Sequence, residues 1–165
     1  MLTRRTLGAR LPRLAIRVST VLLLTGPVSA VAQMPGQQEP LNLGPNPVIA
    51  GMPVQCYGVP AVVTPINDIA MARPGVIILS PQFFQLPGKL QLFIYAHECA
   101  HHVPQISGNE DMADCWAIKV GRVQGWFTQQ DIVYLQQYFG GSPGDWTHAP
   151  GPIRVQQMIN CFVTP

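Results

Sequence analysis

The pattern of apolar positions along the chain changes its period near residue 88. Before that point, apolar residues form short runs that predict strands at 54–63, 69–72 and 76–79. After it, apolar residues recur every three or four positions, as they do on one face of a helix. A small sheet that is followed by helices is typical of the α+β class, so we expect that class here.

Four helices are expected in the second part of the chain, over residues 88–103, 109–125, 128–139 and 152–162. Their ends coincide with residues that cap or interrupt helices, namely Pro104, Asn109, Thr128, Gly140 and Pro152. The expected domain is therefore a short antiparallel sheet with an edge strand, followed by four helices.

The first 32 residues have the three-part pattern of a secretory signal peptide. Residues 1–17 hold five arginines, residues 18–25 are mostly apolar, and the small residues Ala30 and Ala32 follow. The apolar stretch is shorter than the roughly 20 residues that a membrane span needs. We expect a secreted or periplasmic protein, cleaved after Ala32 or Ala30, with no stable membrane span afterwards. An uncleaved anchor is the alternative.

Residues 33–53 contain five prolines and show no hydrophobic period. This composition predicts an extended arm that precedes the folded domain, which we expect over residues 54–165. Whether the arm is a pro-segment that covers a site is open at this stage.

The charge of the chain is divided unevenly along its length. The formal net charge is +2, but residues 33–165 hold five basic residues against all eight acids, a net charge of −3. Proteins that bind nucleic acids need a basic surface for the phosphates. The charge pattern therefore excludes nucleic acid as the expected partner.

The four cysteines all follow the predicted signal peptide, at Cys56, Cys99, Cys115 and Cys161. An even number of cysteines in an exported protein predicts disulfides, here two, with three possible connectivities. A zinc site built from thiolates is the alternative, although no Cys-x-x-Cys pair is present.

The helix expected at 88–103 contains the motif His97-Glu98-x-x-His101. With four His and three Glu in 165 residues, the chance of such a motif arising at random is about 0.2%. At 100° per residue the two histidines lie 40° apart, one turn above the other. Two imidazoles in this arrangement can bind one zinc ion per chain, and Glu98 can reach a water beside it.

A catalytic zinc ion has a third protein ligand and an open position. Glu110 begins the next expected helix nine residues after His101, and Asp114 lies on the same face at i+4. We expect Glu110 as the third ligand and Asp114 as the acceptor for a histidine N–H. The reverse assignment, with Asp114 as the ligand and Glu110 behind it, is the alternative.

Two residues near the end of the chain are further candidates. His148 is the one histidine outside residues 97–102, and it lies in a loop rich in Gly and Pro. We assign it to stabilising an oxyanion, with a surface histidine as the alternative. Arg154 is expected to pair with Asp114 or another acid near the site, or to be solvated at a helix start.

These motifs resemble those of gluzincin metallopeptidases. The segment from His97 to His102, with Glu110-x-x-Ala113-Asp114, is similar to the HtpX/CAAX-prenyl-protease type and to the bacterial neutral zinc metallopeptidases. Asn67-Asp68-Ile69-Ala70 to Ile77 and Thr147-His148-Ala149-Pro150 to Arg154 also resemble elements of that family. The gap between His101 and Glu110 is shorter than is usual there.

The resemblance implies a small zincin-like domain in which residues 69–79 contain the edge strand of a substrate cleft. It also implies a peptide or protein substrate and hydrolysis by a zinc-activated water, with Glu98 as the general base. The alternative is a zinc-binding, chaperone-like or partner-binding protein with little or no hydrolysis. A third possibility is a disulfide-braced domain without metal.

Overall fold

The computed structural model describes residues 39–164, which belong to a compact unit that begins at Gly36. The predicted signal peptide lies outside the described residues, as does the first part of the predicted arm. Within residues 39–164, no helix is long and apolar enough to cross a membrane.

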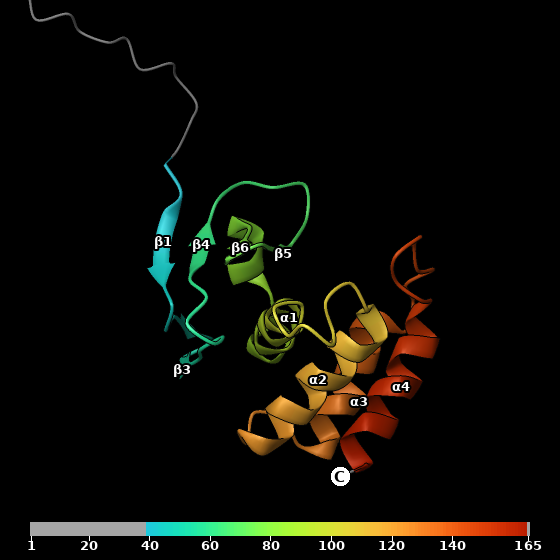
Figure 1. The fold of residues 1–165 in the computed structure, drawn as a ribbon. Helices are drawn as coiled ribbons and strands as arrows, with labels where there is room; N and C mark the ends of the chain where they lie inside the picture. The colour runs from blue at the N-terminus through green and yellow to red at the C-terminus, as the bar shows by residue number, and fades with distance from the viewer. Residues whose placement is uncertain (1–38, 165) are drawn as a thin grey trace, which may run out of the picture. The chain divides into compact units, whose positions relative to one another are not determined.

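Four strands form a mixed sheet in the order β1-β4-β6-β5 (Figure 1). They are β1 (Leu41–Gly44), β4 (Ala61–Val63), β5 (Ala70–Arg73) and β6 (Val76–Leu79). The β1–β4 and β5–β6 pairs are antiparallel, whereas β4 and β6 are parallel. The expected all-antiparallel sheet is therefore wrong: after β4 the chain first forms the outer strand β5, and then returns as β6 beside β4.

The expected arm at 33–53 contributes strands to the fold in its described part. Besides β1, it contains β2 (Val48–Ile49) and β3 (Met52–Pro53), which pair with each other. Its prolines there stand between strands or at a strand end, where a missing N–H does not interrupt the ladder. The sheet therefore begins before residue 54, the start that we expected for the domain.

The strand expected at 54–63 is reduced to the three residues of β4. Tyr57 and Gly58 turn the chain with φ of 48° and 80°, and the Val59 N–H donates to the Cys56 carbonyl across this turn. A left-handed backbone cannot continue a strand, so the apolar run at 54–63 is interrupted at its centre.

The four expected helices are all present, and the α+β class is confirmed. They are α1 (Gly88–Ala100), α2 (Glu110–Val123), α3 (Gln129–Phe139) and α4 (Gly151–Val163), and a short 3₁₀ helix, η1 (Pro81–Gln85), precedes them. Asn109 and Thr128 cap α2 and α3 by accepting hydrogen bonds from backbone N–H groups of the first turn.

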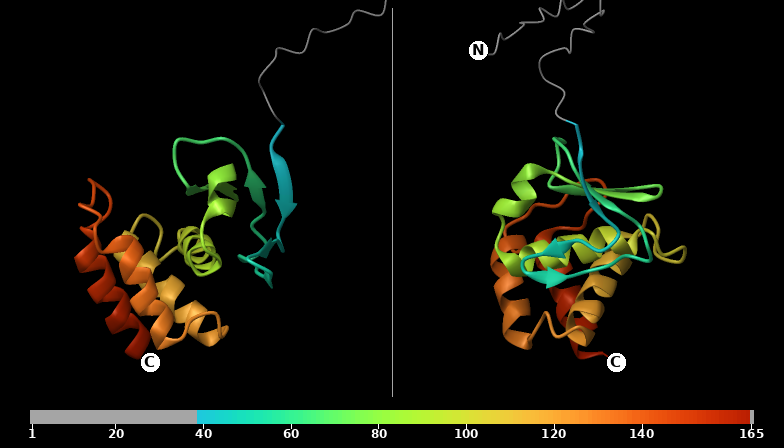
Figure 2. Two further views of the ribbon diagram at one scale, coloured as in Figure 1. Left: turned by 180° about the vertical axis from the view of Figure 1, so that it is seen from behind. Right: turned by 90° about the vertical axis from the view of Figure 1, so that its left-hand side faces the viewer.

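Helix α1 is the centre of the fold, because the sheet lies on one side of it and the other three helices lie on the other (Figures 1 and 2). This position explains why nine of its thirteen residues are buried. Phe93, Tyr95 and Ala96 are each at most 2% exposed. Because α1 is enclosed on both sides, the backbone at its C-terminal end is held in place, and the side chains attached there start from fixed positions.

Two disulfides brace the helices, as the even number of cysteines predicted. Cys56–Cys99 joins the turn before β4 to α1, and Cys115–Cys161 joins α2 to α4. They close segments of 43 and 46 residues. Disulfides across such segments typically stabilise a fold by about 2–4 kcal/mol each.

The loop between α3 and α4 is closed at its base by two glycines. The Gly151 N–H donates to the Ser142 carbonyl at 2.9 Å, and a Cβ on Gly151 would lie 1.4 Å from the Phe139 carbonyl oxygen. Gly144 has a φ of 77°, and a Cβ there would lie 2.8 Å from the His148 carbonyl oxygen. The tight base fixes the loop that carries His148.

We predict that Gly151→Ala lowers the free energy of unfolding by about 2 kcal/mol or more, because the new Cβ collides with backbone. The matched control is Gly141→Ala, ten residues earlier, where a Cβ meets nothing within 4 Å. Urea unfolding of both variants checks the prediction. Equal stability of the two variants would contradict the close packing at the base of the loop.

Candidate metal centre

The C-terminal end of α1 presents the three residues of the sequence motif. His97 and Glu98 lie in the last turn of α1, and His101 follows directly as its C-cap. His97 is 5% exposed, and Glu98 and His101 are half-buried. The enclosed position of α1 therefore fixes these side chains before any ligand binds.

A short connection brings the first turn of α2 back to the end of α1. Ile106, in the middle of this connection, is buried and packs with Ala100 of α1 and Ala113 of α2. The Asn109 side chain then starts α2 by accepting a hydrogen bond from the Met112 N–H at 2.9 Å. Glu110, the first residue of α2, is thereby placed beside the two histidines.

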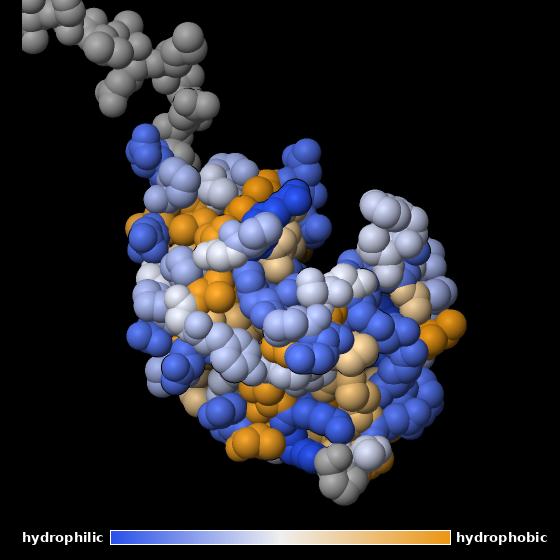
Figure 3. Space-filling model, viewed as in Figure 1, coloured by the Kyte–Doolittle hydropathy of each residue, from blue (hydrophilic) through white to orange (hydrophobic). Residues whose placement is uncertain are grey.

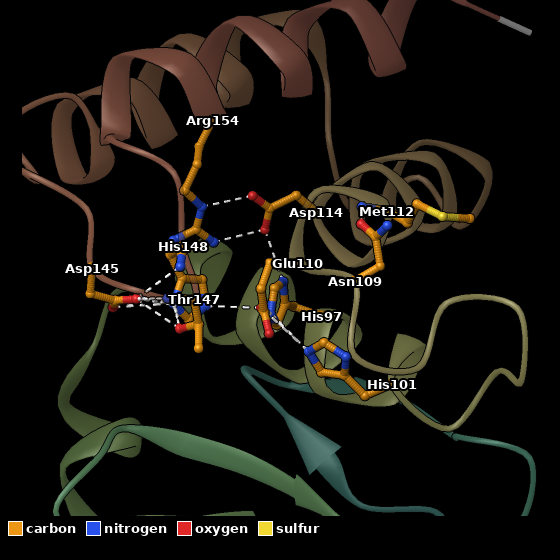
Figure 4. A network of polar contacts seen from close by, with 10 residues as sticks. All are labelled: His97, His101, Asn109, Glu110, Met112, Asp114, Asp145, Thr147, His148 and Arg154. Carbon is orange, nitrogen blue, oxygen red and sulfur yellow. Dashed lines mark hydrogen bonds and ion pairs between the residues drawn. The ribbon is translucent and has the colours of Figure 1, made fainter.

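The nitrogen and oxygen atoms of three side chains converge at one point (Figure 4). His97 Nε2 lies 3.2 Å from His101 Nε2 and 2.9 Å from Glu110 Oε2. His101 Nε2 lies 3.5 Å from the same carboxylate oxygen. All three atoms are within contact distance of one another, although they come from two helices.

These separations suit a tetrahedral metal ion. With bonds of about 2.0–2.2 Å to zinc, two ligand atoms at tetrahedral corners are about 3.3–3.6 Å apart. The three distances of 2.9, 3.2 and 3.5 Å are close to this range. Two imidazoles and one carboxylate are also ligand types that zinc accepts, so the residues present fit the metal that the motif predicts.

His148 brings a third imidazole to the same carboxylate. Its Nε2 lies 2.9 Å from Glu110 Oε2, and His97, Glu110 and His148 form a group whose ligand atoms are all within 4.8 Å. These three residues could hold a metal ion as well. The described residues thus offer three imidazoles around one carboxylate.

A buried carboxylate contacts His97 at Nδ1, the ring nitrogen that does not face the converging atoms. Asp114 is 1% exposed, and its Oδ1 lies 2.8 Å from His97 Nδ1. Arg154 of α4 donates to both oxygens of Asp114, from Nε at 2.7 Å and from Nη2 at 2.8 Å. A histidine whose Nδ1–H is donated in this way presents the lone pair of Nε2 to a metal.

The carboxylates around His97 change its protonation in the metal-free centre. Burial lowers the pKa of His97, but hydrogen bonds to Asp114 and Glu110 outweigh burial and raise it to about 9. The hydrogen bond to His97 lowers the pKa of Glu110. Burial raises the pKa of Asp114, yet the hydrogen bonds from Arg154 and His97 bring it below its ordinary value. Below its raised pKa, His97 carries a proton on Nε2 that a metal ion has to displace.

Asp145 fixes the orientation of His148. Its Oδ1 accepts hydrogen bonds from the backbone N–H groups of Thr147 and His148, at 2.7 and 2.8 Å, and from the Thr147 hydroxyl. On the ring, Nδ1 lies 3.3 Å from Asp145 Oδ2 and 2.8 Å from the Thr147 hydroxyl oxygen. With Nδ1 occupied inside its own turn, the ring presents Nε2 to Glu110.

The residues of the centre line a cavity of about 610 Å³. One wall of the cavity is the edge strand β5 with the turn after it, and His148 belongs to the lining as well. Figure 3 shows a hollow on this face, between the sheet and the loop before α4. The residues of the motif therefore face an accessible space.

Glu98 faces this cavity without being among the converging ligand atoms. Burial raises the pKa of its carboxyl group, while the His97 charge and a hydrogen bond from the Ala72 N–H lower it less strongly. A carboxylate whose pKa is raised and that reaches a cavity is suited to accept a proton there.

The sequence singled out seven residues for the site, and the structure places them around one centre. His97, His101 and Glu110 converge, Asp114 and Arg154 lie behind His97, and Glu98 and His148 line the cavity. The pairing of Arg154 with Asp114 is one of the alternatives that the sequence left open.

Sequence reasoning missed Asp145. An Asp that precedes Thr and His by two and three residues is typical of a turn in which the carboxylate accepts backbone N–H groups. That local pattern at 145–148 was the available signal. It indicates that the loop has a defined conformation, and that His148 is oriented by it.

Comparison of the chain with family models, with curated proteins and with solved structures found no match.

We predict that the purified protein binds one zinc ion per chain and that Glu110→Ala weakens binding by more than about 100-fold, because even partners behind a ligand contribute 10- to 100-fold. Asp111→Ala is the matched control, since Asp111 is exposed at the next position of the same helix turn. Elemental mass spectrometry and zinc titration give the two values. Equal loss of zinc in both variants would exclude Glu110 as a metal ligand.

The raised pKa of His97 makes the stability of the metal-free protein depend on pH. A pKa of about 9 in the folded state against 6.5 in the unfolded state means that the contribution is complete below pH 6.5. It is lost as the pH rises through 9. We predict that Tm of the metal-free protein falls by roughly 5 °C or more over this window.

A zinc-loaded sample is the comparison for this pH series. Metal binding requires the imidazole without its Nε2 proton, so zinc removes the His97 contribution to the pH dependence. Thermal unfolding with and without zinc measures both curves. A metal-free protein whose Tm is constant from pH 6.5 to 9 would contradict the pairing of a protonated His97 with Asp114 and Glu110.

Proposed function

We propose that the chain is an exported zinc metallopeptidase of the gluzincin type, which hydrolyses peptide bonds in a peptide or protein substrate. The observation that carries the proposal is the convergence of His97, His101 and Glu110 beside Glu98 at the base of an open cavity. Two disulfides and the predicted signal peptide support an oxidising location outside the cytoplasm.

In the proposed reaction, His97, His101 and Glu110 would hold a zinc ion, whose charge would lower the pKa of a water and polarise the scissile carbonyl. Glu98 takes a proton from the attacking water and passes it to the leaving amine. The raised pKa of Glu98 favours both proton transfers. A carboxylate whose pKa is closer to neutral pH accepts the proton of the water more readily and can hold it until the leaving amine takes it.

His148 is proposed to stabilise the oxyanion that develops on the scissile carbonyl. Asp145 and Thr147 hold the ring from the Nδ1 side and leave Nε2 on the cavity side, where it lies 2.9 Å from Glu110 Oε2 in the metal-free centre. In the proposed reaction Glu110 binds the metal, and an Nε2–H of His148 would point to the substrate oxygen. A donor that is already oriented does not have to be reorganised during the reaction, which is the main advantage of such groups.

The substrate is proposed to lie as an extended peptide along β5. This strand is an edge of the sheet and lines the cavity with Ala70, Met71 and Ala72. An extended peptide can add to an edge strand through backbone hydrogen bonds, independently of most of its sequence. Antiparallel addition to β5 would carry the peptide past Glu98.

A second candidate function follows from the position of His148. If His148 binds the metal together with His97, His101 and Glu110, four protein ligands close the tetrahedron. Closed four-ligand sites are structural and leave no position for water. The chain would then be a zinc-binding protein that acts on a partner without hydrolysis.

The substitution Glu98→Gln tests the proposal. We predict at least a 100-fold loss of cleavage of fluorescently labelled casein, with zinc retained, because the proton acceptor is lost while the ligands remain. Glu39→Gln, the same change at an exposed position at the start of the described range, is the matched control and keeps full activity. Cleavage that is insensitive to Glu98→Gln would exclude Glu98 as the base.

His148→Ala separates the two candidate functions in the same assay. For a peptidase, zinc affinity is retained and cleavage falls, since an oxyanion donor typically contributes a factor of about 100–1,000. For a closed site, the wild-type protein cleaves nothing, and His148→Ala loses zinc affinity.

A further inference from the structure

A second cavity, of about 260 Å³, adjoins the metal centre on the side of α3. It shares five lining residues with the larger cavity, namely Asp68, Ala70, His97, Glu98 and His148, so its contents would lie directly beside the reacting bond. Sites for whole small molecules usually occupy roughly 300–1,000 Å³. The smaller volume suits one side chain of a bound peptide.

Five of the twelve residues that line this cavity are apolar. They come from β5, α1, α3 and the segment before β5, namely Ile69, Ala70, Phe93, Ile94 and Phe139. A side chain that enters the cavity must therefore bring a hydrophobic portion of some length.

The rim of the same cavity is acidic. Asp68 and Asp145 line it and are both exposed. Among the described residues that line the cavity, Arg154 has the one guanidinium, and Asp114 binds it through two of its nitrogens. Asp145 faces His148 Nδ1 at 3.3 Å, whereas Asp68 accepts a backbone N–H from Ile69 at 2.7 Å, so the negative charge of the rim lies chiefly on Asp68.

The balance remains negative when a divalent metal is counted. The metal centre and this cavity together contain five carboxylates, those of Asp68, Glu98, Glu110, Asp114 and Asp145. Arg154, Arg73 in the wall of the larger cavity and a zinc ion supply four positive charges against them. One negative charge is therefore in excess, and Asp68, which lines both cavities, is exposed to solvent.

We infer that this cavity accepts the side chain of a lysine or arginine that flanks the scissile bond of the substrate. Lys and Arg combine a long apolar stem with a charged end, and they bury the stem while the end stays at a polar surface. The apolar residues of the lining suit the stem, and the exposed carboxylates of Asp68 and Asp145 suit the charged end. The inference rests on the proposed peptidase function and names its substrate class.

The test uses fluorogenic peptides that differ at one position next to the cleaved bond, on either side in turn. That position holds Lys, norleucine or Glu; norleucine keeps the stem of lysine and lacks its charge. We expect kcat/KM about fivefold higher for Lys than for norleucine, which is the size of an exposed ion pair, and lower still for Glu. High salt should reduce the Lys preference.

The substitution Asp68→Asn tests whether the rim of the cavity causes the preference for Lys over norleucine. The amide oxygen can still accept the hydrogen bond that Asp68 accepts from the Ile69 N–H, so the local turn is kept. We expect the ratio of Lys to norleucine to fall to about half or less. Asp111→Asn, at an exposed acid of α2 that lines neither cavity, leaves the ratio unchanged.

Binding is measured as well, by calorimetry of the same peptides with zinc-loaded Glu98→Gln. A Lys preference in binding without hydrolysis by the wild type would refute the peptidase and support the pocket. Hydrolysis with equal rates for Lys and norleucine on both sides of the bond would overturn the pocket alone. Faster cleavage or tighter binding of the Glu peptide would also overturn the lysine pocket and assign recognition to Arg154. If no peptide binds at all, both the pocket and the peptidase function are refuted.

Discussion

The buried ion pair of Asp114 with Arg154 is the interaction on which the arrangement of the centre depends. A carboxylate that is 1% exposed is costly to bury unless charged groups face it, and Arg154 and His97 do so from two different helices. The pair therefore requires α4 to dock on α2, and the neighbouring disulfide Cys115–Cys161 holds the same two helices together. Without this docking His97 would lose the group that orients it.

The same docking determines where the loop before α4 lies. Gly151, three residues before Arg154, is packed against the carbonyl of Phe139 and closes the base of that loop. His148 reaches Glu110 from this closed loop. The C-terminal end of α1 and the first turn of α2 hold the converging ligand atoms. The loop before α4 brings His148 to them as a third segment of the chain.

The sequence predicted the helices and which of their side chains share a helix face, because both depend on local spacing. Two histidines at i and i+4 share a helix face wherever the helix is placed, and so do Glu110 and Asp114. The parallel pairing of β4 with β6 and the strand β1 could not be predicted in this way. They depend on contacts between distant segments, and the prolines around β1 concealed its short apolar pattern. His148 could be nominated as the one isolated histidine, but its contact with Glu110 required the tertiary structure.

Cys99 stands inside the motif, between Glu98 and His101, and its sulfur is bonded to Cys56. At 100° per residue, Cys99 lies about 160° around the helix from both His97 and His101, so its sulfur is directed away from the converging nitrogens. The disulfide therefore ties the last turn of α1 to the turn before β4 from the face opposite the centre. The geometry of the ligands thus depends on a covalent bond between two sulfurs that belong to the core and are not themselves ligands.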